Sequence, residues 1–247
     1  MSDDGKRRWS GPKSGDARRS SGRRSGERKV KAHNARSESS KRWIERQLSD
    51  PYVQKALDHG YRARAAFKLI ELDAKAGLLA RNQRVVDLGC APGGWLQVAL
   101  ERGASEVVGI DLLPVDPVPG AHIVQGDVRV EEDVARLMDG LSGAPDIVLS
   151  DMAANTTGHR QTDHLRTIAL VELALDFAMA RLAPGGHFVS KVFQGGATQD
   201  VLDALKSGFR EVRHSKPPAS RSGSPEIYVI AKGFRGAPQT GPGQGTG

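Results

Sequence analysis

The chain has 247 residues, of which 38% are hydrophobic, so it is long enough to bury one sizeable core. Its net charge of +7 is unevenly spread, because residues 1–42 carry fourteen Lys or Arg against five Asp or Glu. The single cysteine, Cys90, excludes an intramolecular disulfide, and the lack of a long apolar run argues against a signal peptide or a membrane span. We therefore expect a cytoplasmic protein with no membrane partner.

Both ends of the chain have the composition of disordered segments. Residues 1–40 are rich in Ser, Gly and Arg and nearly lack aliphatic side chains, so burial cannot offset the entropy of ordering them. Residues 236–247 are rich in Gly and Pro. The basic arm is either a solubilising tail or a contact for a polyanion, and we favour the second because the rest is nearly neutral. One folded domain is expected over residues 41–235.

Predicted strands and helices alternate between these ends. In chain order they are a helix at 63–79, a strand at 84–89, a helix at 94–103, strands at 105–112 and 121–127, a helix at 130–141, a strand at 145–152, a helix at 164–182, a strand at 187–193, a helix at 198–208, and strands at 209–216 and 226–234. Apolar strands separated by helices predict a doubly wound α/β fold, with a mainly parallel sheet covered on both faces.

The segment DLGCAPGGW, residues 87–95, is predicted to form a turn at the carboxyl end of the first strand. Open parallel sheets bind ligands at this edge, and the glycines allow a close approach. The turn lacks the Lys-Ser/Thr of a Walker loop and departs from the dinucleotide pattern G-x-G-x-x-G. Pro92 also removes one N–H donor. A ligand without phosphate therefore suits the turn better, which argues against an NAD(P)-dependent oxidoreductase.

Acids follow at the ends of the next two predicted strands. Asp111 lies 22 residues after Gly89, where a carboxylate can bond both ribose hydroxyls, and Asp127 could accept from an adenine amino group. One acid at a strand end is usually a cap or turn residue, but this ordered set after a glycine turn points to a ligand. A ribose and an adenine without pyrophosphate describe S-adenosylmethionine. No cluster of His, Cys and carboxylates suggests a metal site.

Two residues are candidates for catalysis on physical grounds alone. Asp151 ends the predicted strand 145–152, where its negative charge would suit a methyl sulfonium. Lys191 lies in the apolar strand HFVSKVF, where an unpaired ammonium would be costly. Burial and a second nearby cation would favour the neutral amine near pH 7, and such an amine can act as a general base.

The chain resembles the FtsJ/RrmJ family of ribose 2′-O-methyltransferases, and among them the bacterial enzymes that modify 23S rRNA. The similar segments occur in the family's order and are GYRARAAFKLIEL, VVDLGCAPGGW, LSDMAANTTGHRQTDH, GGHFVSKVFQG and KPPASRSGSPEIYVIAKGF. They cover about residues 40–235. The basic arm is not part of the usual pattern, and Cys90 stands where the family commonly has alanine.

This resemblance implies a Rossmann-like methyltransferase fold with a mostly parallel seven-stranded sheet whose last strand is antiparallel. It implies S-adenosylmethionine as methyl donor and no metal. The residues that we expect to bind this cofactor are Gly93, Trp95, Asp111, Asp127 and Asp151. The implied catalytic tetrad, with Lys191 as general base for the ribose 2′-hydroxyl, is Lys68, Asp151, Lys191 and Glu226. The residues alone would not have singled out Lys68 or Glu226, since a lysine on a helix is usually solvated.

The implied substrate is a uridine in the A-loop of 23S rRNA, presented by the assembled large subunit to a monomeric enzyme with no DNA partner. Basic residues beside the site are candidate phosphate contacts, namely Arg62, Arg64, Lys216 and Arg221. Each could equally be a solvated surface charge. The alternatives are the same chemistry on tRNA and a non-catalytic RNA-binding assembly factor, and the intact tetrad argues against the second.

Overall fold

The computed structural model describes residues 49–154, 158–193 and 198–236, so the expected basic arm and most of the C-terminal tail lie outside the described residues. The described elements, in chain order, are α2 (Pro51–Asp58), α3 (Ala65–Ala76), β1 (Arg84–Leu88), α4 (Gly94–Glu101), β2 (Glu106–Asp111), β3 (Ala121–Gln125), α5 (Glu131–Met138), β4 (Ile147–Ser150), α6 (Arg160–Arg181), β5 (His187–Phe193), α7 (Gln199–Gly208), β6 (Phe209–Ser215) and β7 (Glu226–Phe234).

Two helices differ from the sequence-based expectation. Helix α2 is additional, and it starts where the Asp50 side chain accepts the N–H of Tyr52 at 3.0 Å, with Pro51 in the first turn. Helix α6 begins at Arg160 rather than at residue 164, because the His159 imidazole accepts a hydrogen bond from the third N–H of the helix. The other helices and strands lie close to their predicted ranges.

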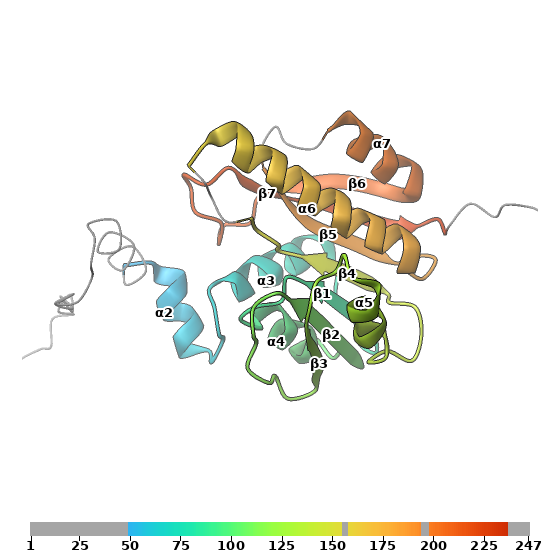
Figure 1. Cartoon of the computed structure of the whole chain (residues 1–247). Coiled ribbons are helices and arrows are strands. Elements are labelled where there is room, and N and C mark those ends of the chain that lie inside the picture. The colour runs from blue at the N-terminus through green and yellow to red at the C-terminus, as the bar shows by residue number, and fades with distance from the viewer. Residues whose placement is uncertain (1–48, 155–157, 194–197, 237–247) are drawn as a thin grey trace, which may run out of the picture. The chain divides into compact units, whose positions relative to one another are not determined.

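The seven strands form one sheet in the order β3-β2-β1-β4-β5-β7-β6 (Figure 1). Strands β1 to β5 pair in parallel, whereas β7 runs antiparallel to both of its neighbours, β5 and β6. This arrangement confirms the predicted α/β methyltransferase fold with an antiparallel last strand. The winding direction reverses between β1 and β4, and such a switch point opens a crevice at the carboxyl ends of the strands.

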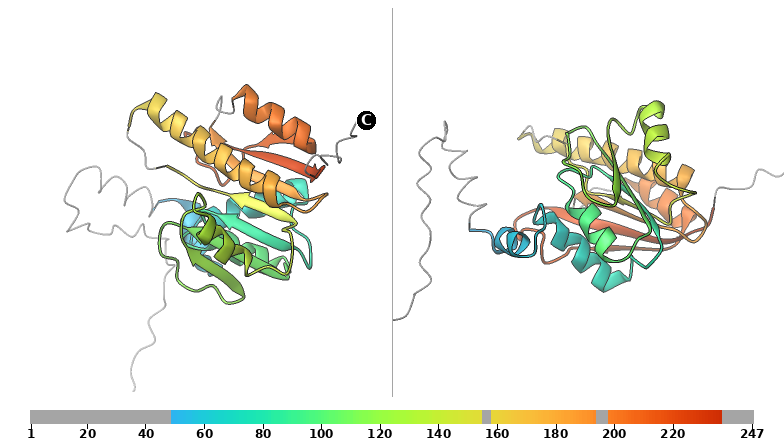
Figure 2. Two further views of the ribbon diagram at one scale, coloured as in Figure 1. Left: turned by 45° about the vertical axis from the view of Figure 1, so that its right-hand side comes forward. Right: turned by 90° about the horizontal axis from the view of Figure 1, so that it is seen from below.

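Helices cover both faces of the sheet (Figure 2). Strand β1 contributes to the core on both faces, since Val86 and Leu88 belong to one buried cluster with side chains of α5, α6 and α7, while Val85 belongs to another with side chains of α3 and α4. A strand buried on both faces must be apolar at successive positions, as the sequence indicates. Within the described residues, no helix is long and apolar enough to cross a membrane.

Candidate active site

A cavity of about 680 Å³ lies at the carboxyl edge of the sheet, over the switch point. Three of the acids that the sequence singles out line it together, namely Asp111 at the end of β2, Asp127 after β3 and Asp151 after β4. Helix α6 contributes Leu170 and Leu173. The carboxyl ends of parallel strands meet at one edge, so residues far apart in the chain share this cavity.

Gly89 lets the ends of β1 and β4 approach each other. It has a φ of +80°, and a Cβ atom built on it would lie 2.6 Å from Met152 Cγ and 3.1 Å from Met152 Cα. Both the left-handed backbone and the close approach therefore require glycine here. Because Met152 directly follows Asp151, this contact also places the Asp151 backbone beside the turn.

Asp111 ties the glycine turn to the loop after β2. Its Oδ2 accepts the N–H of Ala91 at 2.9 Å, and its Oδ1 accepts the N–H of Leu113 at 2.8 Å. Each carboxylate oxygen has a further lone pair, so the side chain can still accept hydrogen bonds from a ligand in the cavity.

Asp127 is paired with Arg129, a residue that sequence reasoning missed. The Arg129 Nε donates to Asp127 Oδ1 at 2.9 Å and its Nη2 to Oδ2 at 2.5 Å. These hydrogen bonds, with the adjacent positive charge, hold the pKa of Asp127 below its usual range. The acid expected to accept from an adenine amino group is therefore ionised, and Arg129 also lines the cavity. A spacing of two residues in a loop carries no signal for such a pair.

Gly93 and Trp95 are not among the residues that line the cavity. The Trp95 indole N–H donates to the Ala65 carbonyl at 2.8 Å, and its ring is tilted against that of Tyr228 at 5.9 Å. Gly93 has a φ of +109° and is the N-terminal cap of α4. Both residues thus fix the turn and its helix, and their contact with a cofactor stays a prediction. Nearby Cys90 is buried, which raises the pKa of its thiol and suits a small packing residue.

The four residues of the expected tetrad converge beside this cavity. Lys191 Nζ lies 3.2 Å from Asp151 Oδ1 and donates to the Asp151 carbonyl at 2.7 Å. Lys68 Nζ lies 3.4 Å from Asp151 Oδ2 and 3.4 Å from Glu226 Oε2. Asp151 therefore stands between two ammonium groups, and Glu226 holds the second of them.

The register of β7 explains why Glu226 belongs to this cluster. In the antiparallel pair with β5, Glu226 lies opposite Phe193 and Tyr228 lies opposite Lys191. Because β7 runs against β5, its first residues lie at the edge where β5 ends. Glu226 is therefore brought to the cavity by strand direction, a property that its local sequence does not encode.

Tyr228 is a further member of the cluster that sequence reasoning missed. Its buried hydroxyl donates to Asp151 Oδ1 at 2.6 Å, and Lys68 Nζ lies 5.7 Å from its ring centroid. Burial, together with the charge of Asp151, raises the pKa of Tyr228 well above its usual value, so the hydroxyl remains a donor. The i, i+2 spacing from Glu226 was an available signal, because alternate residues of a strand share a face.

Asp151 is ionised despite its surroundings. Burial alone would raise the pKa of its carboxyl, but the charges of Lys191 and Lys68 and the hydrogen bond from Tyr228 outweigh burial and lower it.

Asp87 in β1 is the opposite case, since burial and the nearby carboxylates of Asp151 and Asp111 raise its pKa well above the usual value. Among the described residues, neither oxygen of Asp87 has a hydrogen-bond partner.

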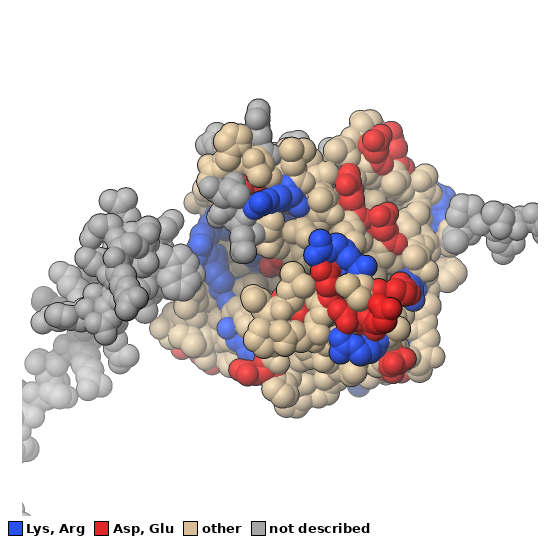
Figure 3. Space-filling view, viewed as in Figure 1, with Lys and Arg blue, Asp and Glu red and all other residues tan. Residues whose placement is uncertain are grey.

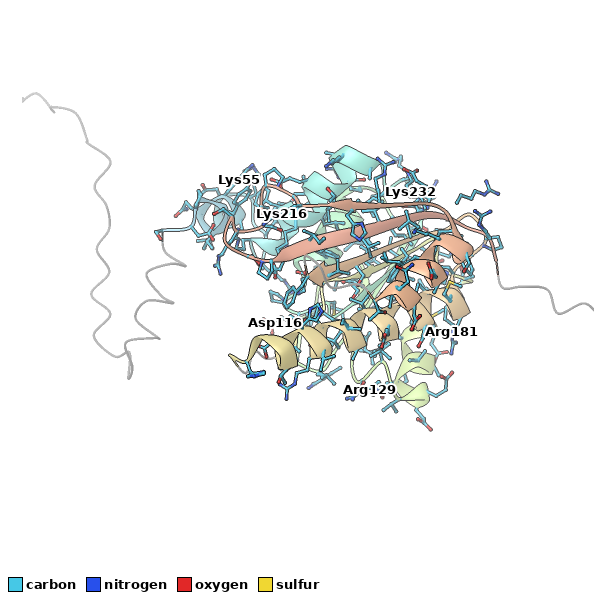
Figure 4. All side chains as sticks on the ribbon, turned by 90° about the horizontal axis from the view of Figure 1, so that it is seen from above. Lys55, Asp116, Arg129, Arg181, Lys216 and Lys232 are labelled. Carbon is cyan, nitrogen blue, oxygen red and sulfur yellow. The ribbon has the colours of Figure 1, made fainter. Side chains whose placement is uncertain are left out.

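The four candidate phosphate contacts all have partners within the protein. Arg64 and Arg221 both pair with Asp50, and Arg64 also donates to the Ala219 carbonyl. Lys216, labelled in Figure 4 at the same end of the molecule as Lys55 of α2, donates to the Ser224 carbonyl at 2.8 Å. The partners of Arg62 are main-chain carbonyls. Of the four, Lys216 and Arg221 are exposed, whereas Arg62 and Arg64 are partly buried.

An acid-lined cavity at the switch point of a seven-stranded sheet, with β7 antiparallel, is the architecture of the Rossmann-like methyltransferases. The family model for FtsJ-like methyltransferases matches residues 61–234, and the chain belongs to this family. The match begins before α3 and ends with β7, so it includes the cavity and all four tetrad residues.

Individual relatives agree with this assignment. The chain is 69% identical over 235 residues to a protein of Hyphomonas neptunium named ribosomal RNA large subunit methyltransferase E, covering 95% of this chain and 100% of the relative. A protein of the same name from Granulibacter bethesdensis is 59% identical over 206 residues, covering 83% and 90%. The crystal structure of a Plasmodium falciparum protein assigned as a ribosomal RNA methyltransferase has a TM-score of 0.64 and 35% identity, covering 71% of this chain and 100% of that one.

Proposed function

We propose that this protein transfers a methyl group from S-adenosylmethionine to the 2′-hydroxyl of a uridine in the A-loop of 23S rRNA, on the assembled large subunit. The observation that carries the proposal is the position of Asp151, which lines the cavity and also bonds both lysines of the tetrad. A methyl donor bound in the cavity and a ribose hydroxyl bound beside the two lysines would therefore both lie next to the Asp151 carboxylate. The names of the relatives support ribosomal RNA of the large subunit as substrate.

The residues of the cavity fit S-adenosylmethionine. This cofactor carries a sulfonium and an ammonium, and the carboxyl groups of Asp111, Asp127 and Asp151 line the cavity. The exposed side chains of Leu112 and Leu113 offer apolar surface for a flat adenine. A volume of about 680 Å³ is sufficient for a ligand of this size. When bound, the cofactor supplies an electrophilic methyl group on sulfur.

In the proposed mechanism the chain's own residues orient the acceptor and move one proton. After Lys191 gives one ammonium proton to solvent, its Nζ could take the proton of the 2′-hydroxyl while that oxygen accepts the methyl group and the electron pair of the broken carbon–sulfur bond stays on sulfur. The ammonium so formed is held by the Asp151 carboxylate and carbonyl, at the distances already given. Lys68, held by Glu226, places a second positive charge beside the forming ether oxygen.

The surface charge suggests the side from which RNA approaches. On the face in Figure 3, most Asp and Glu side chains lie at the right, over α5, α6 and α7, with some Lys and Arg among them, and Lys and Arg predominate at the left, toward α2. The phosphate backbone would be repelled by the acidic side and attracted by the basic one. A reaction at a 2′-hydroxyl restricts the acceptor to RNA, because DNA lacks this group.

The test is to incubate the protein with labelled S-adenosylmethionine and, in parallel, with large subunits, free 23S rRNA or tRNA that lack the modification. The proposal expects a 2′-O-methyluridine in the A-loop and the fastest reaction with intact subunits. Label in tRNA alone would contradict the assigned substrate. Cofactor binding without transfer to any of the three would favour the non-catalytic assembly factor.

Replacing Lys191 by alanine tests the proposed base. We expect kcat to fall by about 10²- to 10⁴-fold, the usual contribution of a general base, while the affinity for S-adenosylmethionine changes little. Initial rates and titration calorimetry separate the two quantities. Lys206→Ala, at an exposed position near the end of α7, is the matched control. Near-normal turnover of Lys191→Ala would show that another group takes the proton.

A further inference from the structure

The Arg62 guanidinium, in the loop between α2 and α3, holds two loops together. Its Nη1 donates to the carbonyl of Pro92 at 3.1 Å and to that of Asp116 at 2.5 Å, and its Nη2 donates to the carbonyl of Pro117 at 2.6 Å. Asp116 is labelled in Figure 4. Pro92 belongs to the glycine turn after β1, whereas residues 116 and 117 belong to the loop after β2.

The same two segments are also joined on their cavity side. There the Asp111 carboxylate accepts the N–H groups of Ala91 in the turn and Leu113 in the loop. Asp111 lines the cavity and Arg62 does not, so the two side chains tie turn to loop at different places. Neither segment is a helix or a strand, and regular main-chain pairing does not set the distance between them.

Arg62 is itself fixed on α4. Its main-chain N–H donates to Gln97 Oε1 at 2.9 Å, and Gln97 Nε2 donates to the Gly60 carbonyl at 3.0 Å. A Cβ atom at Gly93 would lie 3.1 Å from Arg62 Nη1 and 2.9 Å from Val118 Cγ2. Glycine at position 93 therefore leaves room for the guanidinium and the loop to close against the turn.

We propose that Arg62 is a positioning residue for the cofactor, which sets the separation of the turn and the loop that enclose the nucleoside half of S-adenosylmethionine. This inference rests on the proposed function, because it assigns that cofactor to the cavity. Within the described residues the guanidinium forms no salt bridge, and its charge is met by carbonyl dipoles. An arginine that binds RNA phosphates would instead direct its N–H donors to solvent. The guanidinium reaches the three carbonyls from two separate nitrogens, whereas a lysine ammonium donates from a single nitrogen and would have to sit at one point between them.

The test compares Arg62→Ala and Arg62→Lys with the wild-type chain. Calorimetric titration with S-adenosylmethionine, without RNA, should show affinity weakened by about tenfold or more in both variants, as expected for the loss of charged hydrogen bonds. The KM for the RNA substrate, the salt dependence of RNA binding and kcat at saturating cofactor should stay within about twofold of the wild type. Arg213→Ala, an exposed arginine of β6 paired with Glu211, is the matched control and should alter none of these quantities.

Three outcomes would overturn the inference. Unchanged cofactor affinity with a raised RNA KM and a log–log salt slope reduced by about one would make Arg62 a phosphate ligand. A lowered melting temperature with unchanged cofactor affinity would make it a purely structural residue. Wild-type affinity in Arg62→Lys, which keeps the charge and is the safer variant for folding, would show that the guanidinium is not needed. If the wild-type chain itself failed to bind S-adenosylmethionine, the proposed function would fail first, so the two failures are distinguishable.

Discussion

The carboxylate of Asp151 is held by three side chains that come from three different elements. Lys68 from α3 approaches one oxygen, and Lys191 from β5 and Tyr228 from β7 approach the other. These contacts outweigh the cost of burying the charge. Replacement of any one partner should therefore disturb the position of the carboxylate, and through it the two lysines.

Tyr228→Phe removes a single hydroxyl from this cluster while the ring stays packed. Because a hydrogen bond to a carboxylate is removed, we expect kcat to fall by about tenfold with little change in cofactor affinity. Steady-state kinetics on the RNA substrate would measure it. The matched control is Tyr52→Phe, whose hydroxyl donates to Glu71 at 2.8 Å outside the cavity, and which should keep wild-type kcat. Equal effects of the two variants would contradict a role for the Tyr228 hydroxyl.

Asp87 predicts a pH dependence of stability. In the folded protein the pKa of the Asp87 carboxyl is raised, whereas in the unfolded chain it is about 4. Between these two values, folding therefore requires the carboxyl to take up a proton. The stability that this group contributes is fully present below about pH 4 and is lost as pH rises toward the folded pKa. Asp87→Asn, which is neutral at every pH, should be more stable than wild type at pH 7 by about 1 kcal/mol or more, and the difference should shrink toward pH 4. Urea unfolding across this pH range measures it, and parallel profiles of the two proteins would contradict it.

At the scale of elements, strand direction does most to assemble the site. Strand β7 enters the sheet between β5 and β6 and runs against both, so its first residue, Glu226, reaches the edge where the parallel strands end. Helix α3 packs on the adjacent face of the sheet, which brings Lys68 within 3.4 Å of both Glu226 and Asp151. The site therefore depends on four elements that are distant in the chain, namely α3, β4, β5 and β7.

The ends of β1 and β4 offer a second prediction at this scale. Gly89→Ala would force a Cβ atom to 3.1 Å from the Met152 backbone at a positive φ, so we expect a loss of about 3 kcal/mol in unfolding free energy and weaker cofactor binding. Gly60→Ala is the matched control, since Gly60 has a φ of +75° but nothing within 4 Å of its built Cβ, and it should lose only about 1 kcal/mol. Urea unfolding and cofactor titration give both values. Equal losses would mean that the backbone conformation alone, and not the contact with Met152, matters.

At the scale of the whole molecule, the charge of the chain is divided between a basic arm and a nearly neutral remainder. Removing residues 1–40 should weaken binding to rRNA and make its salt dependence shallower, by about 0.7–0.9 in log–log slope for each phosphate that the arm neutralises. Removing residues 237–247, which carry no charged side chain, is the matched control and should leave both quantities unchanged. Filter binding at several salt concentrations measures the slopes. An unchanged slope in the arm deletion would assign the arm to solubility.

The sequence alone predicts the fold class and the residues at the carboxyl ends of the strands. Periodicity and apolar runs located β1 to β7 because local side-chain patterns follow strand and helix geometry, and the order of Gly89, Asp111 and Asp127 indicated a nucleoside ligand. The family resemblance added Lys68 and Glu226, which no local pattern marks. Helix α2 and the start of α6 depend on caps that lie outside the apolar pattern.

Which side chains act together depends on the tertiary structure. It joined Tyr228 to Asp151, Arg129 to Asp127, and Arg62 to the carbonyls of two loops. It also left Asp87 buried without a hydrogen-bond partner in the described residues. These are contacts between residues far apart in the chain, or between side chains whose direction is set by packing. These contacts depend on the order of the strands in the sheet and on how the loops pack against one another. The residue pattern within a single segment determines neither of them.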